Sequence, residues 1–303
     1  MDREIVRVGT RRSALALWQA HWVVERMKRH TPHLQVQVVE VHTLGDRRRD
    51  LPLSQAGGVG LFVKELEQAL LRGEIDLAVH SLKDLPTRLP PGLALAAVPE
   101  RGDPRDAVAS RTGLPLARLP TGALVGTSSR RRAAQALALR PDLRIADIRG
   151  NVDTRLRKVE EGKYDAAILA VAGLIRLGRA DRITEILPPE IMLPAVGQGA
   201  LAVEVRADDK RIRSLVAPLD HPPTRAAVTA ERAFLARLGG GCHAPVGAYA
   251  EVDGHQIRLR ALVASPDGRT IVRGARQGTT SEAEAVGRAL AEDLLARGAD
   301  ALV

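Results

Sequence analysis

The chain has 303 residues, of which 45% are hydrophobic and 2% aromatic, and its formal net charge is +9. That length exceeds what one core usually supports, so we expect two or three domains with cores of Ala, Leu, Val and Ile. No apolar run approaches the roughly 20 residues that cross a bilayer, which argues against a membrane protein. The basic excess predicts acidic partners, either nucleic acid or an acidic small molecule.

The numbers of cysteine, lysine and asparagine residues indicate the cellular compartment and the heat stability of the protein. The single cysteine, Cys242, cannot form an internal disulfide, and the sequence begins without an apolar signal segment. Both features predict a cytoplasmic protein. Only 6 of the 45 basic residues are lysine, and Asn151 is the one asparagine. This composition predicts heat stability, and it means that no single arginine counts as functional merely by being present.

The first hundred residues alternate between strand and helix patterns. The expected strands cover residues 5–10, 35–43 and 75–80, and the expected helices cover 13–30 and 61–72. Between them, residues 44–60 form a long polar loop that contains an arginine run at 47–49. Loops of this length in a compact domain are usually functional or disordered.

A second block of the same kind follows residue 100. The expected strands cover 124–126, 144–148 and 165–170, and the expected helices cover 130–139, 152–161 and 172–177. A proline-containing linker is expected at 187–194, and it leads to a strand at 200–205 that returns to the first domain.

The last part has a different pattern. A helix at 224–238 precedes strands broken at Asp253-Gly254 and Asp267-Gly268, which are hairpin signals, and a final helix covers 281–297. The sequence therefore predicts two α/β domains with mainly parallel sheets and a third, smaller α+β domain. The expected limits are 1–99 with 200–217, then 100–199, then 218–303.

Hydroxyls and arginines follow three of the expected strands, each time where a helix begins. These stretches are Thr10-Arg11-Arg12-Ser13, Thr127-Ser128-Ser129-Arg130-Arg131-Arg132 and Arg149-Gly150-Asn151-Val152-Asp153-Thr154-Arg155. Helix N-termini attract anions, and arginine pairs with carboxylates or phosphates through two parallel bonds. Ligands of open α/β sheets bind at such strand ends. One such stretch is a weak signal, but several predict a ligand with several negative groups.

Asp84 is the acidic residue among these cationic strand ends, in Ser81-Leu82-Lys83-Asp84. Its carboxylate could transfer a proton or stabilise a developing cation. The alternatives are a helix cap or an ion pair with Lys83. We find no spacing typical of metal ligands, so no metal site is expected.

Cys242 follows Gly239-Gly240-Gly241. Three glycines remove bulk and permit unusual backbone conformations, which favours an accessible thiol suited to covalent attachment. The alternative is a small buried hydrophobic residue.

Taken together, these stretches resemble the porphobilinogen deaminase (hydroxymethylbilane synthase) family. The resemblance extends from about residue 6 to the C-terminal helix, and its most specific parts cover residues 61–67, 78–84, 125–132, 149–155, 193–200 and 231–242. It implies a transferase of tetrapyrrole biosynthesis that joins four porphobilinogen molecules head to tail, releasing ammonia, into linear hydroxymethylbilane. It also implies two domains like those of periplasmic binding proteins and a third that carries the cysteine.

The resemblance assigns roles to individual residues. Cys242 would hold a dipyrromethane cofactor through a thioether, and Asp84 would be catalytic. The positions that match cofactor contacts are Ser81, Lys83, Asp84, Thr127, Ser129, Arg131 and Arg132. The positions that match substrate contacts are Arg11, Ser13, Gln19, Phe62, Arg149, Arg155, Arg176 and Gln198. A monomer that binds neither nucleic acid nor membrane is expected.

The loop at 44–60 departs from the family pattern, because Gln55 and Val59 stand where many members have lysine. Two other functions also fit the composition: a non-catalytic binding protein for a polyanionic metabolite, for which Asp84 and Cys242 would be dispensable, and a nucleic-acid binder. The scarcity of aromatic residues, which leaves no stacking platform, argues against the latter.

Overall fold

The computed structural model describes residues 5–41, 63–239 and 244–302. It divides into two compact units, Met1–Gly102 with Ala200–Arg225 and Asp103–Gly199 with Ala226–Val303. The chain thus leaves the first unit after Gly102 and returns to it at Ala200. The finer division into three domains stays a prediction.

The first unit is built on a five-stranded sheet of order β2-β1-β3-β10-β4. Its strands are β1 (Val6–Arg11), β2 (Val36–Val41), β3 (Leu77–Ser81), β4 (Leu93–Ala97) and β10 (Leu201–Arg206). β1 runs parallel to β2 and β3, whereas β10 runs antiparallel to β3 and β4. The sheet is therefore mainly parallel, as predicted, and only β10, the strand that returns to this unit at Ala200, runs in the opposite direction.

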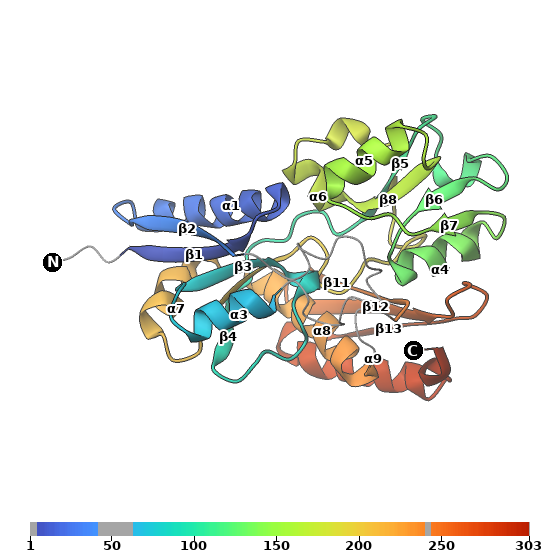
Figure 1. Ribbon diagram of the computed structural model, residues 1–303. Coiled ribbons are helices and arrows are strands. Elements are labelled where there is room, and N and C mark those ends of the chain that lie inside the picture. Colours follow the sequence, from blue (N-terminus) through green and yellow to red (C-terminus); the bar gives the residue numbers. More distant parts are fainter. Residues whose placement is uncertain (1–4, 42–62, 240–243, 303) are drawn as a thin grey trace. The chain divides into compact units, whose positions relative to one another are not determined.

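Helices cover both faces of this sheet (Figure 1). α1 (Ala14–His30) and α7 (Lys210–Val216) pack on one face, where they share a core with Val8, Val79 and Val203. α3 (Lys64–Leu71) covers the other face through Leu66 and Leu70. Because side chains alternate along a strand, the residues of β3 and β10 that do not face α1 face α3.

The second unit contains a matching sheet of order β7-β6-β8-β5-β9. Its strands are β5 (Asp106–Ser110), β6 (Leu124–Gly126), β7 (Arg144–Ala146), β8 (Ala166–Ala170) and β9 (Glu185–Leu187). β6 runs parallel to β7 and β8, and β5 runs antiparallel to β8 and β9. α4 (Arg130–Leu139) covers one face, and α5 (Val152–Glu160) and α6 (Val171–Arg176) cover the other.

The remainder of this unit is a three-stranded antiparallel meander with two helices. It comprises β11 (Val246–Asp253), β12 (Gln256–Ala264), β13 (Ile271–Thr279), α9 (Ala283–Leu295) and most of α8 (Pro222–Leu238). Both predicted hairpins are present, and Gly268 has a φ of 71°. A Cβ there would lie 2.1 Å from the carbonyl oxygen of Ala134 on α4, so only glycine fits.

The predicted fold class is confirmed: two α/β sheets with helices on both faces, and a smaller α+β part. Short 3-10 turns cover Leu82–Asp84, Leu116–Arg118, Ala180–Arg182, Ala217–Leu219, Thr280–Glu282 and Ala299–Leu302. Within the described ranges, no helix combines the length and the apolar character that crossing a membrane requires.

Candidate active site

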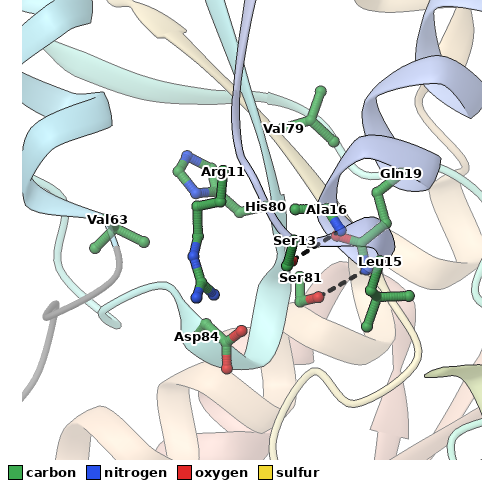
Figure 2. A pocket seen from close by; sticks show the side chains of 10 residues that line it. All are labelled: Arg11, Ser13, Leu15, Ala16, Gln19, Val63, Val79, His80, Ser81 and Asp84. Carbon is green, nitrogen blue, oxygen red and sulfur yellow. Dashed lines mark hydrogen bonds between the residues drawn. The ribbon is translucent and has the colours of Figure 1, made fainter. Parts of the chain in front are cut away.

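A pocket opens at the end of β3 in the first unit (Figure 2). Its lining residues come from the ends of two adjacent strands, the start of α1 and the segment before α3: Arg11, Ser13, Leu15, Ala16, Gln19, Val63, Val79, His80, Ser81 and Asp84. The parallel pairing of β1 with β3 brings these two strand ends to the same edge of the sheet. The pocket brings together five of the expected site residues: Arg11, Ser13, Gln19, Ser81 and Asp84.

Among the described residues that line this pocket, Asp84 alone carries a carboxylate. It ends the 3-10 turn Leu82–Asp84, and its side chain is half-buried. Among the described residues its carboxylate accepts no hydrogen bond and joins no ion pair, so it neither caps a helix nor pairs with Lys83. Figure 2 shows the carboxylate on the same side of the pocket as the Arg11 guanidinium. Asp84 is thus an acceptor that is held ready for a ligand.

The start of α1 is fixed by local hydrogen bonds. The Ser13 hydroxyl accepts from the Ala16 backbone N–H at 3.2 Å, so Ser13 is the N-cap of α1, at the start of the helix expected over 13–30. Gln19, 2% exposed, donates from Nε2 to the Ser81 hydroxyl at 2.8 Å. These bonds hold α1 against the end of β3 and so fix the pocket wall.

A hydroxyl-rich turn follows β6 in the second unit. The buried Thr127 hydroxyl accepts from the Ser129 backbone N–H at 3.2 Å, and Ser129 caps α4 by accepting from the Arg132 N–H at 3.4 Å. Both hydroxyl groups retain capacity for a further hydrogen bond.

Arg131 and Arg132 are buried in the structure. Both contact Asp106, which is 0% exposed: Arg131 Nη1 lies 2.7 Å from Oδ2, and Arg132 Nη2 lies 2.6 Å from Oδ1. The two guanidinium groups also donate to the carbonyl oxygens of Leu193 and Ile168. Despite complete burial, these two cations hold the pKa of Asp106 far below its usual range.

The Gly150 segment begins α5. Asn151 is its N-cap and accepts from the Thr154 backbone N–H at 2.9 Å. Gly150 has a φ of 108°, and a Cβ there would lie 2.5 Å from Thr154 Cγ2. Arg149 is half-buried, and Arg155 donates from Nε to the Gly150 carbonyl oxygen at 2.9 Å. Arg149 and Arg155 thus lie on either side of the N-terminus of α5, six residues apart in the sequence.

Arg176 and Gln198 contact the segments at which the chain passes between the units. Arg176 Nη2 donates to the Gly199 carbonyl oxygen at 2.6 Å, and burial lowers the pKa of Arg176 to about 10. Gln198, 1% exposed, donates from Nε2 to the Pro104 carbonyl oxygen at 2.7 Å and to Asp106 at 2.9 Å. Gln198 thus connects the segment just before the chain returns to the first unit, near Gly199, with the segment just after it leaves that unit, near Pro104.

Two expected site residues, Cys242 and Phe62, lie outside the described residues, as do Gln55 and Val59 of the long loop. Sequence reasoning did not single out Asp106, Glu67 or Glu204, all of which are buried. For Asp106 and Glu204 the sequence did hold a signal, because each carboxylate belongs to an apolar stretch of strand length, at 106–110 and 201–205. A charge buried in such a strand needs a buried partner.

Residues 6–214 match the family model described as porphobilinogen deaminase, dipyromethane cofactor binding domain, and residues 225–296 match the porphobilinogen deaminase C-terminal domain. Porphobilinogen deaminase of Pelotomaculum thermopropionicum is 56% identical, covering 99% of this chain and 96% of the relative. The protein of that name from Roseiflexus castenholzii is 54% identical and covers 99% of both chains. Among solved structures, the methionine binding protein MetQ covers 72% of this chain and 90% of its own, at 14% identity and a TM-score of 0.45.

Fold and site together define an α/β protein with a carboxylate and several cations at its strand ends, as an enzyme acting on anionic ligands requires. The chain belongs to the porphobilinogen deaminase family. The cofactor of that family is a dipyrromethane attached to a cysteine, and this chain has one cysteine, Cys242.

Proposed function

We propose that this chain condenses four porphobilinogen molecules head to tail into linear hydroxymethylbilane, releasing one ammonia at each step, with Asp84 as the catalytic residue. The observation that carries the proposal is the family match over both parts of the chain, joined to the Asp84 carboxylate in the pocket beside Arg11, which has no hydrogen-bond or ion-pair partner among the described residues. A non-catalytic binding protein would have no need of that carboxylate.

The chemistry of the pocket fits a dipyrromethane and its extension. Each pyrrole ring carries an acetate, a propionate and a ring N–H. The pocket offers a guanidinium at Arg11, hydroxyls at Ser13 and Ser81, and one acceptor at Asp84. Guanidinium and hydroxyl groups suit the carboxylates, and a carboxylate suits the N–H. When bound through Cys242, the dipyrromethane supplies the primer whose free end is extended.

Asp84 would accept the hydrogen bond of the pyrrole N–H. As ammonia leaves the aminomethyl carbon, positive charge develops over the substrate ring. A fixed carboxylate beside the nitrogen stabilises that charge, and it does so more strongly in a half-buried pocket than in water.

The other matched residues would divide into positioning and carboxylate-holding groups. Ser81, Lys83, Thr127 and Ser129 would contact the cofactor. Arg11, Ser13, Arg149, Arg155 and Arg176 would hold acetate and propionate groups. Gln19 would act by fixing Ser81. Arg131 and Arg132, already paired with Asp106, would present their remaining N–H groups to a cofactor carboxylate, and Gln198 and Phe62 would complete the substrate contacts.

We propose further that the protein acts as a cytoplasmic monomer, without nucleic acid or membrane as a partner. Gel filtration with light scattering tests the monomer, since a stable dimer at enzyme concentration would contradict it. Salt-resistant binding to one nucleic-acid structure would contradict the exclusion of nucleic acid, because a basic protein binds DNA weakly in any case.

The direct test is incubation of the purified protein with porphobilinogen. The proposal expects consumption of substrate, release of one ammonia per molecule and formation of linear hydroxymethylbilane. Tight binding without ammonia release would favour the binding-protein alternative instead.

A further inference from the structure

Four consecutive carbonyl oxygens in the second unit, at 147–150, accept hydrogen bonds from side chains. These residues follow β7 and precede Asn151, the N-cap of α5, and they lie outside regular structure. The acceptors and their donors, in chain order, are Asp147 O with Tyr164 Oη at 2.6 Å, Ile148 O with Ser128 Oγ at 3.1 Å, Arg149 O with Lys158 Nζ at 3.1 Å and Gly150 O with Arg155 Nε at 2.9 Å. Side chains thus supply the partners that a strand or a helix would give these backbone groups.

The four donors come from three places around the segment 147–150. Ser128 belongs to the turn after β6, Arg155 and Lys158 belong to α5, and Tyr164 precedes β8. Because the acceptors are consecutive and the donors belong to separate elements, the four bonds together restrict the segment to one backbone path. This is the backbone from which the Arg149 side chain extends.

Packing beneath the segment holds the ring of Tyr164. Ile148 is 0% exposed and belongs to a core cluster with Leu156, against which Tyr164 also packs. A Cβ at Gly126 would lie 2.9 Å from both Ile148 Cδ1 and Tyr164 Cδ1, so glycine leaves room for the two side chains. The Tyr164 ring is thus held in place, and its hydroxyl is fixed at the Asp147 carbonyl oxygen.

The location of the segment connects it with ligand binding. Because β6 and β7 run parallel, 147–150 and the hydroxyl-rich turn after β6 lie at the same edge of the sheet, where open α/β sheets bind ligands. Three cationic residues, Arg149, Arg155 and Lys158, lie within the segment or bond to it. A ligand with several carboxylates suits this edge.

We propose that Tyr164 and Lys158 are positioning residues of the substrate site, which act by fixing the backbone of Arg149. Lys158 holds the Arg149 carbonyl oxygen itself through a charge-assisted bond, and Tyr164 holds the carbonyl oxygen two residues earlier. A guanidinium on a fixed backbone loses less conformational freedom when it pairs with a carboxylate. This inference rests on the proposed function, in which Arg149 holds acetate or propionate groups of the pyrroles.

The expected effect is on substrate binding more than on the chemical step. Arg149 would hold the same carboxylates before and during the reaction, and loss of such uniform binding raises KM while kcat stays nearly unchanged. A residue that only stabilises the fold would change the amount of folded enzyme and leave the KM of the folded molecules as it was. Separate measurement of KM and kcat therefore distinguishes positioning from stability.

Tyr164→Phe is the first test, because it removes one hydroxyl without a change of charge. We expect the KM for porphobilinogen to rise by roughly threefold to tenfold, the range that one lost hydrogen bond corresponds to, with kcat within about twofold. Lys158→Met should raise KM at least as far, and Lys158→Arg, which keeps a charged donor, should restore most of the loss. Lys163→Met is the matched control: it removes a lysine charge from an exposed pair with Glu161 and should keep the wild-type KM.

The same comparison in an Arg149→Lys background tests whether Tyr164 acts through Arg149. We expect Tyr164→Phe to raise KM much less in that background than in the wild type, because residues that act as a unit are not additive. An equal rise in both backgrounds would overturn the inference, as would an unchanged KM in both Tyr164→Phe and Lys158→Met.

Hydrogen exchange of the peptide that contains 147–151 follows the segment without turnover. Exchange should be faster in Tyr164→Phe and Lys158→Met than in the wild type and Lys163→Met, because the segment has lost one of its bonds. Unchanged exchange in both variants would contradict the proposed positioning. A wild type that consumes no porphobilinogen would instead refute the proposed function, and the exchange measurement would still decide whether these two side chains hold the segment.

Discussion

The side-chain amide of Gln19 donates a hydrogen bond of 2.8 Å to the hydroxyl of Ser81, which lies 62 residues further along the chain. Gln19 belongs to the second turn of α1, and Ser81 ends β3 three residues before Asp84. This one bond therefore joins the helix that bears Ser13 to the strand end that leads into Asp84.

Gln19→Leu should weaken that connection. The Ser81 hydroxyl loses its buried partner, which costs about 1–3 kcal/mol in the free energy of unfolding. We also expect a lower kcat, because the turn that bears Asp84 is less well fixed. Denaturant unfolding and initial rates measure both effects, with Gln68→Leu on the exposed face of α3 as the control. Equal behaviour of the two variants would contradict this role for Gln19.

Asp84→Asn tests the catalytic carboxylate itself. The substitution is nearly isosteric, and in the described residues the side chain has no internal partner to lose, so the thermal unfolding midpoint should stay close to that of the wild type. Turnover should fall by roughly 10²–10⁴, the range typical of a removed acid–base or charge-stabilising group. Asp181→Asn, which is exposed, serves as the control. Normal product formation by Asp84→Asn would refute the assignment.

Asp106→Asn should destabilise the second unit strongly. It leaves two buried guanidinium groups without their anion, and breaking such a pair costs about 3–5 kcal/mol. The exposed pair Arg140–Asp142 has similar geometry, with 2.6 Å between Nη2 and Oδ2, so Asp142→Asn is a matched control. It should cost about 1 kcal/mol or less, because solvent screens the pair. Chemical denaturation compares the two variants.

The Asp106 effect should also depend on pH. Because the pKa of Asp106 is depressed in the folded state, its contribution is present above the ordinary aspartate pKa of about 3.9 and is lost as pH falls below it. The difference in stability between wild type and Asp106→Asn should therefore be constant near neutrality and shrink in strong acid. A difference that grows on acidification would contradict the ion-pair account.

For Glu67 we expect the opposite dependence of the free energy of unfolding on pH. Its pKa is raised in the folded state from the ordinary value of 4.5, so the folded protein holds this proton more tightly than the unfolded chain. The contribution of Glu67 to stability is largest at low pH and is lost as pH rises above 4.5. In Glu67→Gln the free energy of unfolding should change less with pH in this range. Denaturant unfolding of wild type and variant at a series of pH values measures the difference.

Local features of the fold could be predicted from the sequence. The helix starts after Ser13, Ser129 and Asn151 and the two Asp-Gly hairpins depend on a few adjacent residues, and all of them are present. Strands β4, β5 and β9 were missed, since short apolar runs give no distinctive period. The one reversed strand of each five-stranded sheet, β10 or β5, was missed because its direction depends on where the chain enters the sheet from a distant segment.

The site was predictable only where a strand end and a helix start adjoin in sequence. Arg11, Ser13, Ser81 and Asp84 satisfy that condition and line one pocket. Residues that pair with a buried charge are not adjacent in sequence to that charge. His80 and Glu204 are 124 residues apart, and Arg131 and Asp106 are 25 apart, so nothing in the local sequence pairs them.

The most direct test of the central claim is the intact mass of the purified protein, followed by mapping of the modified peptide. We expect a mass excess of two pyrrole units on the Cys242 peptide in the wild type and none in Cys242→Ser. An unmodified Cys242 thiol that persists after incubation with porphobilinogen or preformed hydroxymethylbilane would contradict the account.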